Sequence, residues 1–130
     1  MAVALIVVAH DGIGPALVGT AEFVLGRLPV NVRALSVSRD SEPEEIIDRL
    51  RAAAAELDDG DGVLVLTDLY GATPTNVART LLDGRRARVI TGINLPMLLN
   101  VLNYPDQSLE RLAELALAGG RDGIVAAGND

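Results

Sequence analysis

The chain has 130 residues, a formal net charge of −7, no cysteine, and 11 basic residues that are all arginine. The lack of cysteine excludes disulfides, zinc–thiolate sites and a thiol nucleophile, and the lack of lysine excludes Schiff-base chemistry and a P-loop lysine. So acidic a chain, with three aromatic residues and no basic run, is not expected to bind nucleic acid, and we expect a single domain over residues 1–130.

The first predicted element is a buried strand that ends on a histidine. Residues 3–9 are apolar without interruption and lead to His10, the only histidine in the chain. The run is too short to span a membrane and no basic region precedes it, so we expect neither a transmembrane segment nor a signal peptide. Its unbroken apolar character is typical of a central strand in a parallel sheet, buried on both faces.

A helix, an edge strand and a second helix are predicted next. Gly12 permits a tight turn, and Pro15 suits the first turn of a helix. Residues 31–37 mix apolar residues with an arginine, which favours an edge strand. Ser41 and Glu44 have the spacing of a capping box, so they predict the start of the second helix.

A second uninterrupted apolar strand, residues 62–67, ends on Asp68. In the loop that follows, Thr73 is predicted as the N-cap of a helix and Pro74 as its first residue. An Asp-Gly pair at residues 83–84 predicts the end of that helix.

The last third of the chain continues the alternation of strands and helices. We expect a short strand at 87–91, a helix at 95–102 that is apolar nearly all round, and a helix at 108–118. Two glycines at 119–120 predict the end of the last helix, and residues 123–127 predict a short final strand.

These elements predict an α/β fold with a doubly wound, mainly parallel sheet. The two most apolar strands, the first and third, are expected at its centre, which gives the strand order 2-1-3-4. The topological switch point then lies between the carboxyl ends of those strands, where such sheets bind ligands. His10 and Asp68 are expected to meet there.

The chemistry predicted for this pair is phosphoryl transfer through histidine. Either residue alone would more often be structural, but a carboxylate bonded to one imidazole nitrogen fixes the tautomer and leaves the other nitrogen free to attack. Asp68 is predicted to orient His10 in this way. The hydroxyl of Thr73 and the backbone N–H groups of Gly71, Ala72 and Thr73 are predicted to bind the phosphoryl oxygens.

Other kinds of site fit less well. The Gly-Ile-Gly-Pro loop after His10 lacks the third glycine of a dinucleotide fingerprint. A metal site made of His10, Asp11 and Asp68 has too few ligands, so we expect neither metal nor cofactor. A serine hydrolase would need a nucleophile elbow, which is missing, and two tyrosines are a thin supply of rings for a flavin.

Three segments together resemble the enzyme IIA domain of the mannose family, part of the bacterial phosphoenolpyruvate:sugar phosphotransferase system. They are the strand that ends in His10, the Asp-Leu-Tyr-Gly-Ala-Thr-Pro loop at 68–74, and the Gly-Ile-Asn-Leu-Pro-Met segment at 92–97. The resemblance covers essentially the whole chain in order and spacing.

The resemblance implies a cytoplasmic phosphotransferase in which the phosphocarrier protein HPr phosphorylates His10. The group then passes to an enzyme IIB partner, for sugar uptake or regulation. Asp68 would orient the imidazole, and Thr73 would contact the phosphoryl group. The resemblance also implies a homodimer in which the C-terminal strand crosses to the other subunit, with the glycines at 119–120 as the hinge.

Three alternatives stay open. Phosphotransfer domains of dihydroxyacetone kinase systems share the histidine and a similar aspartate loop. A receiver domain phosphorylated on Asp68 would have a similar sheet, but it normally needs an acidic pair after the first strand and a later lysine. A regulatory module, in which phosphorylation gates the binding of another protein, is compatible with the same chemistry.

Overall fold

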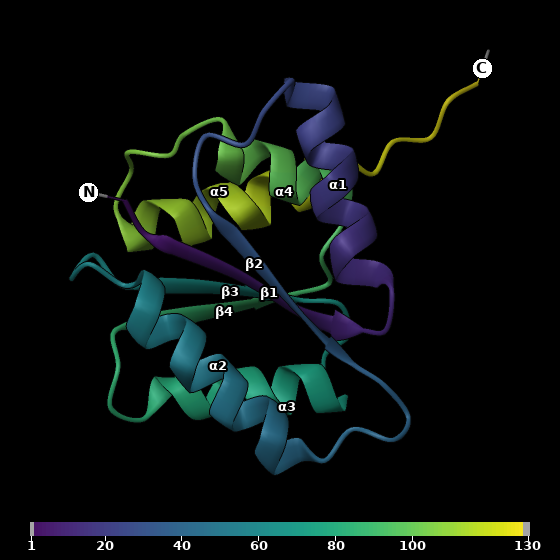
Figure 1. Cartoon of the computed structure of the whole chain (residues 1–130). Helices are drawn as coiled ribbons and strands as arrows, with labels where there is room; N and C mark the ends of the chain where they lie inside the picture. Colours follow the sequence, from purple (N-terminus) through teal and green to yellow (C-terminus); the bar gives the residue numbers. More distant parts are fainter. Residues whose placement is uncertain (1, 129–130) are drawn as a thin grey trace.

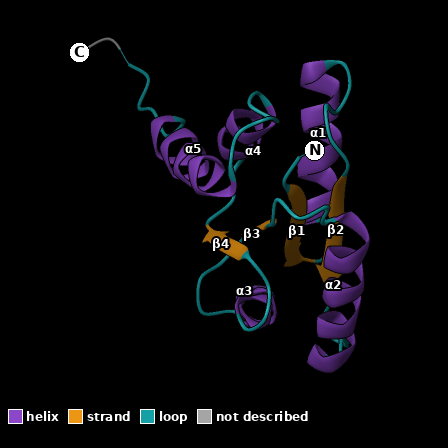
Figure 2. Ribbon diagram, turned by 90° about the vertical axis from the view of Figure 1, so that its left-hand side faces the viewer, coloured by secondary structure: helices purple, strands orange, loops and turns teal. Residues whose placement is uncertain are grey.

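The computed structural model describes residues 2–128, which form a four-stranded parallel sheet between two layers of helices. The sheet has the order β2-β1-β3-β4, as predicted, and Figure 2 shows the four strands side by side in that order. Its strands are β1 (Ala4–His10), β2 (Val32–Val37), β3 (Val63–Thr67) and β4 (Ala87–Thr91).

Helices cover both faces of the sheet (Figure 1). On one face lie α1 (Ile13–Leu25), α4 (Leu95–Leu102) and α5 (Leu109–Asp122). On the other lie α2 (Pro43–Leu57) and α3 (Thr73–Arg79), which continues into a 3₁₀ turn, η1 (Thr80–Leu82). α4 packs against both α1 and α5, which explains why its sequence is apolar nearly all round.

β1 is the rigid centre of this arrangement. Its side chains alternate between two cores, with Leu5 and Val7 packed on the α1 side and Ile6 and Val8 on the α2 side. These four residues are at most 2% exposed, whereas His10 is exposed. The predicted two-sided burial is confirmed, and the strand delivers one imidazole from a fixed backbone to the surface.

The predicted capping box at Ser41 is wrong. α2 begins at Pro43, its N-cap position is Glu42, and no side chain caps it. The Ser41 hydroxyl instead accepts a hydrogen bond from the Ser38 backbone N–H at 2.9 Å and contacts the Ser38 hydroxyl at 3.0 Å. Ser41 therefore closes the turn that follows β2. Hydrogen bonding within such a turn competes with helix capping for a short polar side chain.

The predicted helix end at Gly119 and Gly120 is also wrong, because α5 continues to Asp122. Both glycines lie where α5 approaches α4 closely. A Cβ atom on Gly119 would lie 2.5 Å from the Cβ of Asn100, and one on Gly120 would lie 2.9 Å from the terminal methyl of Met97. The pair permits close helix packing and lies inside the helix, so it is not a hinge here.

The predicted final strand at 123–127 is not formed within the described part of the chain. After α5, residues 124–128 have no regular secondary structure and are exposed, and Figure 1 shows them leading away from the sheet. Ile124 and Val125 are 78% and 75% exposed. A strand needs a partner for its backbone groups, and within residues 2–128 this segment pairs with no strand.

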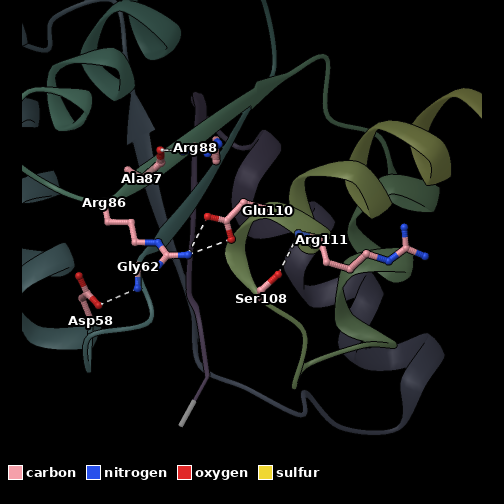
Figure 3. A network of polar contacts seen from close by, with 8 residues as sticks. All are labelled: Asp58, Gly62, Arg86, Ala87, Arg88, Ser108, Glu110 and Arg111. Carbon is pink, nitrogen blue, oxygen red and sulfur yellow. Dashed lines mark hydrogen bonds and ion pairs between the residues drawn. The ribbon is translucent and has the colours of Figure 1, made fainter.

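A network of polar contacts lies at the amino-terminal ends of β3 and β4 (Figure 3). Arg86 donates two hydrogen bonds to the Glu110 carboxylate at 2.7 and 2.8 Å, and Asp58 accepts from the Gly62 N–H at 3.1 Å. Burial acts to raise the pKa of Asp58, but hydrogen bonds from two backbone N–H groups and from Arg85 hold the pKa below its ordinary value.

Within residues 2–128, no helix combines the length and apolar character needed to cross a bilayer.

Candidate functional site

The structure brings His10 and Asp68 into direct contact, as predicted. β1 and β3 are parallel neighbours with Val8 opposite Thr67, so their carboxyl ends lie side by side. The imidazole Nδ1 lies 2.7 Å from Asp68 Oδ2, and the backbone N–H of His10 donates to the same oxygen at 3.0 Å. Two bonds from one residue thus converge on one carboxylate oxygen.

This contact determines which ring nitrogen carries the proton. An ionised carboxylate only accepts hydrogen bonds, so Nδ1 is the protonated nitrogen and the lone pair of neutral His10 lies on Nε2. The His10 side chain is 46% exposed and that of Asp68 11% exposed. The contact between Nδ1 and Asp68 therefore fixes the orientation of the ring, while nearly half of the side chain stays exposed to solvent.

The other carboxylate oxygen of Asp68 has an unusual environment. Oδ1 is buried and has no hydrogen-bond partner within residues 2–128. An unsatisfied buried acceptor is costly, and such groups in a fold call for an explanation. Nothing in the described residues holds the carboxylate through Oδ1, so its orientation depends on Oδ2 and on its backbone.

The residues predicted to bind a phosphoryl group, Gly71, Ala72 and Thr73, lie between Asp68 and α3. Gly71 has a φ of 84°, a left-handed conformation that suits glycine. The Ala72 N–H donates a long hydrogen bond, 3.4 Å, to the Leu69 carbonyl. The Thr73 side chain is exposed.

Thr73 is not the N-cap of α3, contrary to the prediction. The N-cap position is Ala72, which is extended (φ −98°, ψ 171°), and its carbonyl accepts the helical hydrogen bond from the Asn76 N–H at 3.1 Å. Thr73 is the first helical residue, so its hydroxyl is not engaged in capping.

Sequence reasoning missed two buried polar residues beneath this loop. Thr67 and Thr75 are 0% and 1% exposed, and their hydroxyl oxygens lie 2.7 Å apart. The Thr75 hydroxyl also donates to the Leu69 carbonyl at 2.7 Å. The signal available in the sequence was a hydroxyl at the end of an otherwise apolar strand.

The loop after β4 has a structural use. Asn94 caps α4 by accepting from the Met97 N–H at 2.9 Å, and its amide donates to the Gly120 carbonyl at 3.0 Å. The Ile93 N–H donates to the Thr67 carbonyl at 2.9 Å. The bond from Ile93 secures the end of β3 immediately before Asp68, and the two bonds of Asn94 join the start of α4 to α5.

Within residues 2–128, no three His, Cys, Asp or Glu side chains are grouped closely enough to hold a metal ion. What the site offers is an imidazole at the surface with a fixed tautomer, a partly buried carboxylate beside it, and an exposed hydroxyl at the start of a neighbouring helix.

Comparison with protein families gives one match over most of the chain. The family model described as "EIIA-man: PTS system fructose IIA component" matches residues 4–116. The "PTS system mannose-specific EIIAB component" of Escherichia coli (strain K12) is 35% identical over 129 residues, 97% of this chain and 40% of the relative. The "PTS system sorbose-specific EIIA component" of Lacticaseibacillus casei is 29% identical over 110 residues, 83% of this chain and 78% of the relative.

Solved structures share the fold. A mannose/sorbose specific IIA subunit from Enterococcus faecalis matches with a TM-score of 0.90 at 24% identity, over 100% of this chain and 98% of that one. The IIA protein associated with the fucose utilization operon of Streptococcus pneumoniae matches with a TM-score of 0.82 at 26% identity, over 97% and 96% of the two chains. The present chain spans about 40% of the length of the mannose-specific relatives that it matches.

Proposed function

This chain belongs to the EIIA-man family of phosphotransferase-system IIA components, and on that premise we propose that it carries a phosphoryl group on Nε2 of His10. The observation that carries the proposal is the 2.7 Å bond between Nδ1 of the sole histidine and Asp68. It leaves the Nε2 lone pair as the nucleophile, on a side chain that is 46% exposed and that extends from the end of a buried strand.

In the proposed step, the Nε2 lone pair attacks phosphorus and a P–N bond forms. The bond from phosphorus to the donor protein breaks, and its electron pair stays with the leaving atom of the donor. The imidazole becomes cationic as the new bond forms, and the Asp68 carboxylate stabilises that charge through Nδ1–H. No external base is needed, because Nε2 carries no proton before the attack.

The phosphoryl oxygens need hydrogen-bond donors. We assign this role to the Thr73 hydroxyl and to the backbone N–H groups of Gly71, Ala72 and Thr73. The Ala72 N–H is only weakly engaged, by its 3.4 Å bond to the Leu69 carbonyl, so a phosphoryl oxygen can compete for it.

The proposed donor is phospho-HPr and the proposed acceptor is an enzyme IIB partner, both in the cytoplasm. Leu69 and Tyr70 follow Asp68 directly and are 58% and 74% exposed, which provides an apolar contact surface beside the histidine. Transport of a sugar and regulation of another protein both use this chemistry. The identity of the protein that accepts the phosphoryl group from His10 would tell the two roles apart.

We further propose a homodimer in which residues 124–128 of each subunit pair with β4 of the other. β4 is an edge strand with β3 as its one partner within residues 2–128. A groove of about 400 Å³, lined by Tyr70, Leu82 and Arg88 among others, runs beside it. The exposed Ile124 and Val125 would supply apolar side chains for this edge.

Sedimentation of the purified chain tests the dimer. The double variant Ile124→Asp with Val125→Asp should be a folded monomer at concentrations at which the unmodified chain is dimeric. An unmodified chain that stays monomeric at tens of micromolar would contradict the proposal.

Phosphoryl transfer itself is tested with labelled phosphoenolpyruvate, enzyme I and HPr. The chain should acquire phosphate that is labile in acid and stable in base, as expected for phosphohistidine. His10→Ala should take up none while keeping its fold, and Asp11→Asn, the matched control one residue away, should be labelled normally. Base-labile label that persists in His10→Ala would indicate an acyl phosphate on Asp68 and a receiver-type domain instead.

A further inference from the structure

We infer that Thr75 is a positioning residue for phosphoryl transfer, acting on Asp68 through the backbone of Leu69; this rests on the function proposed above. The Thr75 side chain lies on α3, buried beneath the loop that carries Asp68. Its hydroxyl donates to the Leu69 carbonyl at 2.7 Å and contacts the Thr67 hydroxyl at 2.7 Å.

The direction of these bonds follows from the number of protons. A hydroxyl has one proton and a carbonyl has none, so the Thr75 proton points to the Leu69 oxygen. The bond between the two hydroxyls must then be donated by Thr67. The hydrogen bonds therefore run one way, from the Thr67 hydroxyl to the Thr75 hydroxyl and from there to the Leu69 carbonyl.

Leu69 has little else to hold it. Leu69 is 58% exposed, and its carbonyl otherwise accepts only the 3.4 Å bond from the Ala72 N–H within residues 2–128. On the other side of Asp68, Thr67 is secured by the sheet and by the 2.9 Å bond from the Ile93 N–H. Thr75 thus fixes the side of Asp68 that the sheet does not hold.

The unpaired oxygen of Asp68, Oδ1, explains why the bond from Thr75 to the Leu69 carbonyl matters. Within residues 2–128, Oδ1 is buried and has no hydrogen-bond partner. Rotation of the carboxylate toward water would satisfy Oδ1 and weaken the hydrogen bond that Nδ1–H of His10 donates to Oδ2. A backbone fixed on both sides of Asp68 keeps its Cβ at the place from which Oδ2 reaches Nδ1 of His10, whereas a backbone that shifts lets the carboxylate turn away. Loss of the Thr75 hydroxyl should therefore alter the state of His10, although the two residues do not touch.

Three variants separate positioning from simple stability. Thr75→Val is close to isosteric and removes the hydroxyl, Thr75→Ser keeps it, and Thr67→Val breaks the same buried pair but leaves the bond from Thr75 to Leu69. Thr75→Val should accept phosphoryl groups from phospho-HPr about 3- to 10-fold more slowly, the range expected for the net loss of one hydrogen bond. Thr75→Ser should recover most of the rate, and Thr67→Val should lose stability to urea while keeping the rate.

A second readout does not depend on phosphorylation. Because the chain has one histidine, its long-range ¹H–¹⁵N spectrum reports His10 alone. Thr75→Val should show a larger share of the tautomer protonated on Nε2, whereas Thr67→Val should resemble the unmodified chain. If Thr75→Val does not fold, Thr75→Ala is measured in its place. The proposed hydrogen bond also requires that the Thr75 hydroxyl proton of the unmodified chain exchange slowly with water.

The inference is overturned if Thr75→Val keeps both the rate and the tautomer of the unmodified chain. It is equally overturned if Thr75→Val and Thr67→Val slow transfer alike, in proportion to their loss of stability. An unmodified chain that accepts no phosphoryl group would refute the proposed function alone, because the tautomer measurement would still test the role of Thr75.

Discussion

Replacement of Asp68 tests how much its negative charge contributes to the proposed phosphoryl transfer. The backbone N–H of His10 donates to Oδ2, so an asparagine at this position should point its carbonyl oxygen there and its NH₂ group into the place of the orphaned Oδ1. Asp68→Asn therefore keeps the acceptor for Nδ1–H, and with it the tautomer, but removes the charge. Asp68→Ala removes both.

The expected magnitudes follow from the geometry of this contact. A hydrogen bond to a charged group contributes about 1.5–3 kcal/mol and a neutral one about 0.5–1.5 kcal/mol. The His10 ring is 46% exposed, which favours the lower end of each range. Asp68→Asn should slow phosphorylation by phospho-HPr about 5- to 10-fold, and Asp68→Ala about 10- to 100-fold.

The assay is the single-turnover rate of label transfer from phospho-HPr, with folding checked by circular dichroism. Asp11→Asn removes the same charge beside His10, and within residues 2–128 the Asp11 side chain makes no hydrogen bond or ion pair. Its rate should change by less than about twofold, as for an exposed, screened charge. Unchanged transfer in a folded Asp68→Ala variant would refute the assigned role, and slower transfer in Asp68→Asn than in Asp68→Ala would refute the argument on orientation.

Two further predictions concern the stability of the fold. Gly119→Ala should lower the free energy of unfolding in urea by about 1–3 kcal/mol, because its Cβ would lie 2.5 Å from that of Asn100; an unaffected midpoint would mean that the two helices separate freely. Asp58→Asn should cost about 1–2 kcal/mol at pH 7. The pKa of Asp58 is lowered by folding, so its stabilisation is present above the pKa of the unfolded chain and lost as the pH falls through the folded value. Urea midpoints of the two chains should therefore converge on acidification, and a constant difference down to pH 3 would contradict this.

The sheet and the central pair of the site were predictable because two-sided burial leaves a clear pattern. A strand covered on both faces must be apolar at every position, which identifies β1 and β3 as the central strands. Once these two are neighbours and parallel, the residue after each apolar run lies at the same edge. The contact between His10 and Asp68 follows from that topology, without any information on their side chains.

The errors arise where one residue type has several local uses. Ser41 and Thr73 have the composition of helix caps, but a hydroxyl can equally close a turn or remain exposed, and the competing partner is not visible in the sequence. Gly119 and Gly120 look like a helix stop, yet here they admit a neighbouring helix. Tertiary contact decides between these uses.

Two features depend on how separate elements of the fold pack together. The hydroxyls of Thr67 and Thr75 meet only because α3 packs beneath the end of β3. Residues 124–128 have an apolar composition that suits a strand, but no free edge within the described part of the chain pairs with them. A pattern can indicate that a segment is able to form a strand, but the fold or a second subunit must supply the other half of the ladder.

The position of the phosphate on the ring of His10 tests the proposed function most directly. The chain, labelled with ¹⁵N and phosphorylated through enzyme I and HPr, contains one imidazole, so its long-range ¹H–¹⁵N spectrum needs no assignment. We expect the phosphorus to be bonded to Nε2, with Nδ1 still protonated and facing Asp68. Phosphorus on Nδ1, or an unmodified imidazole in a protein that carries phosphate, would contradict it.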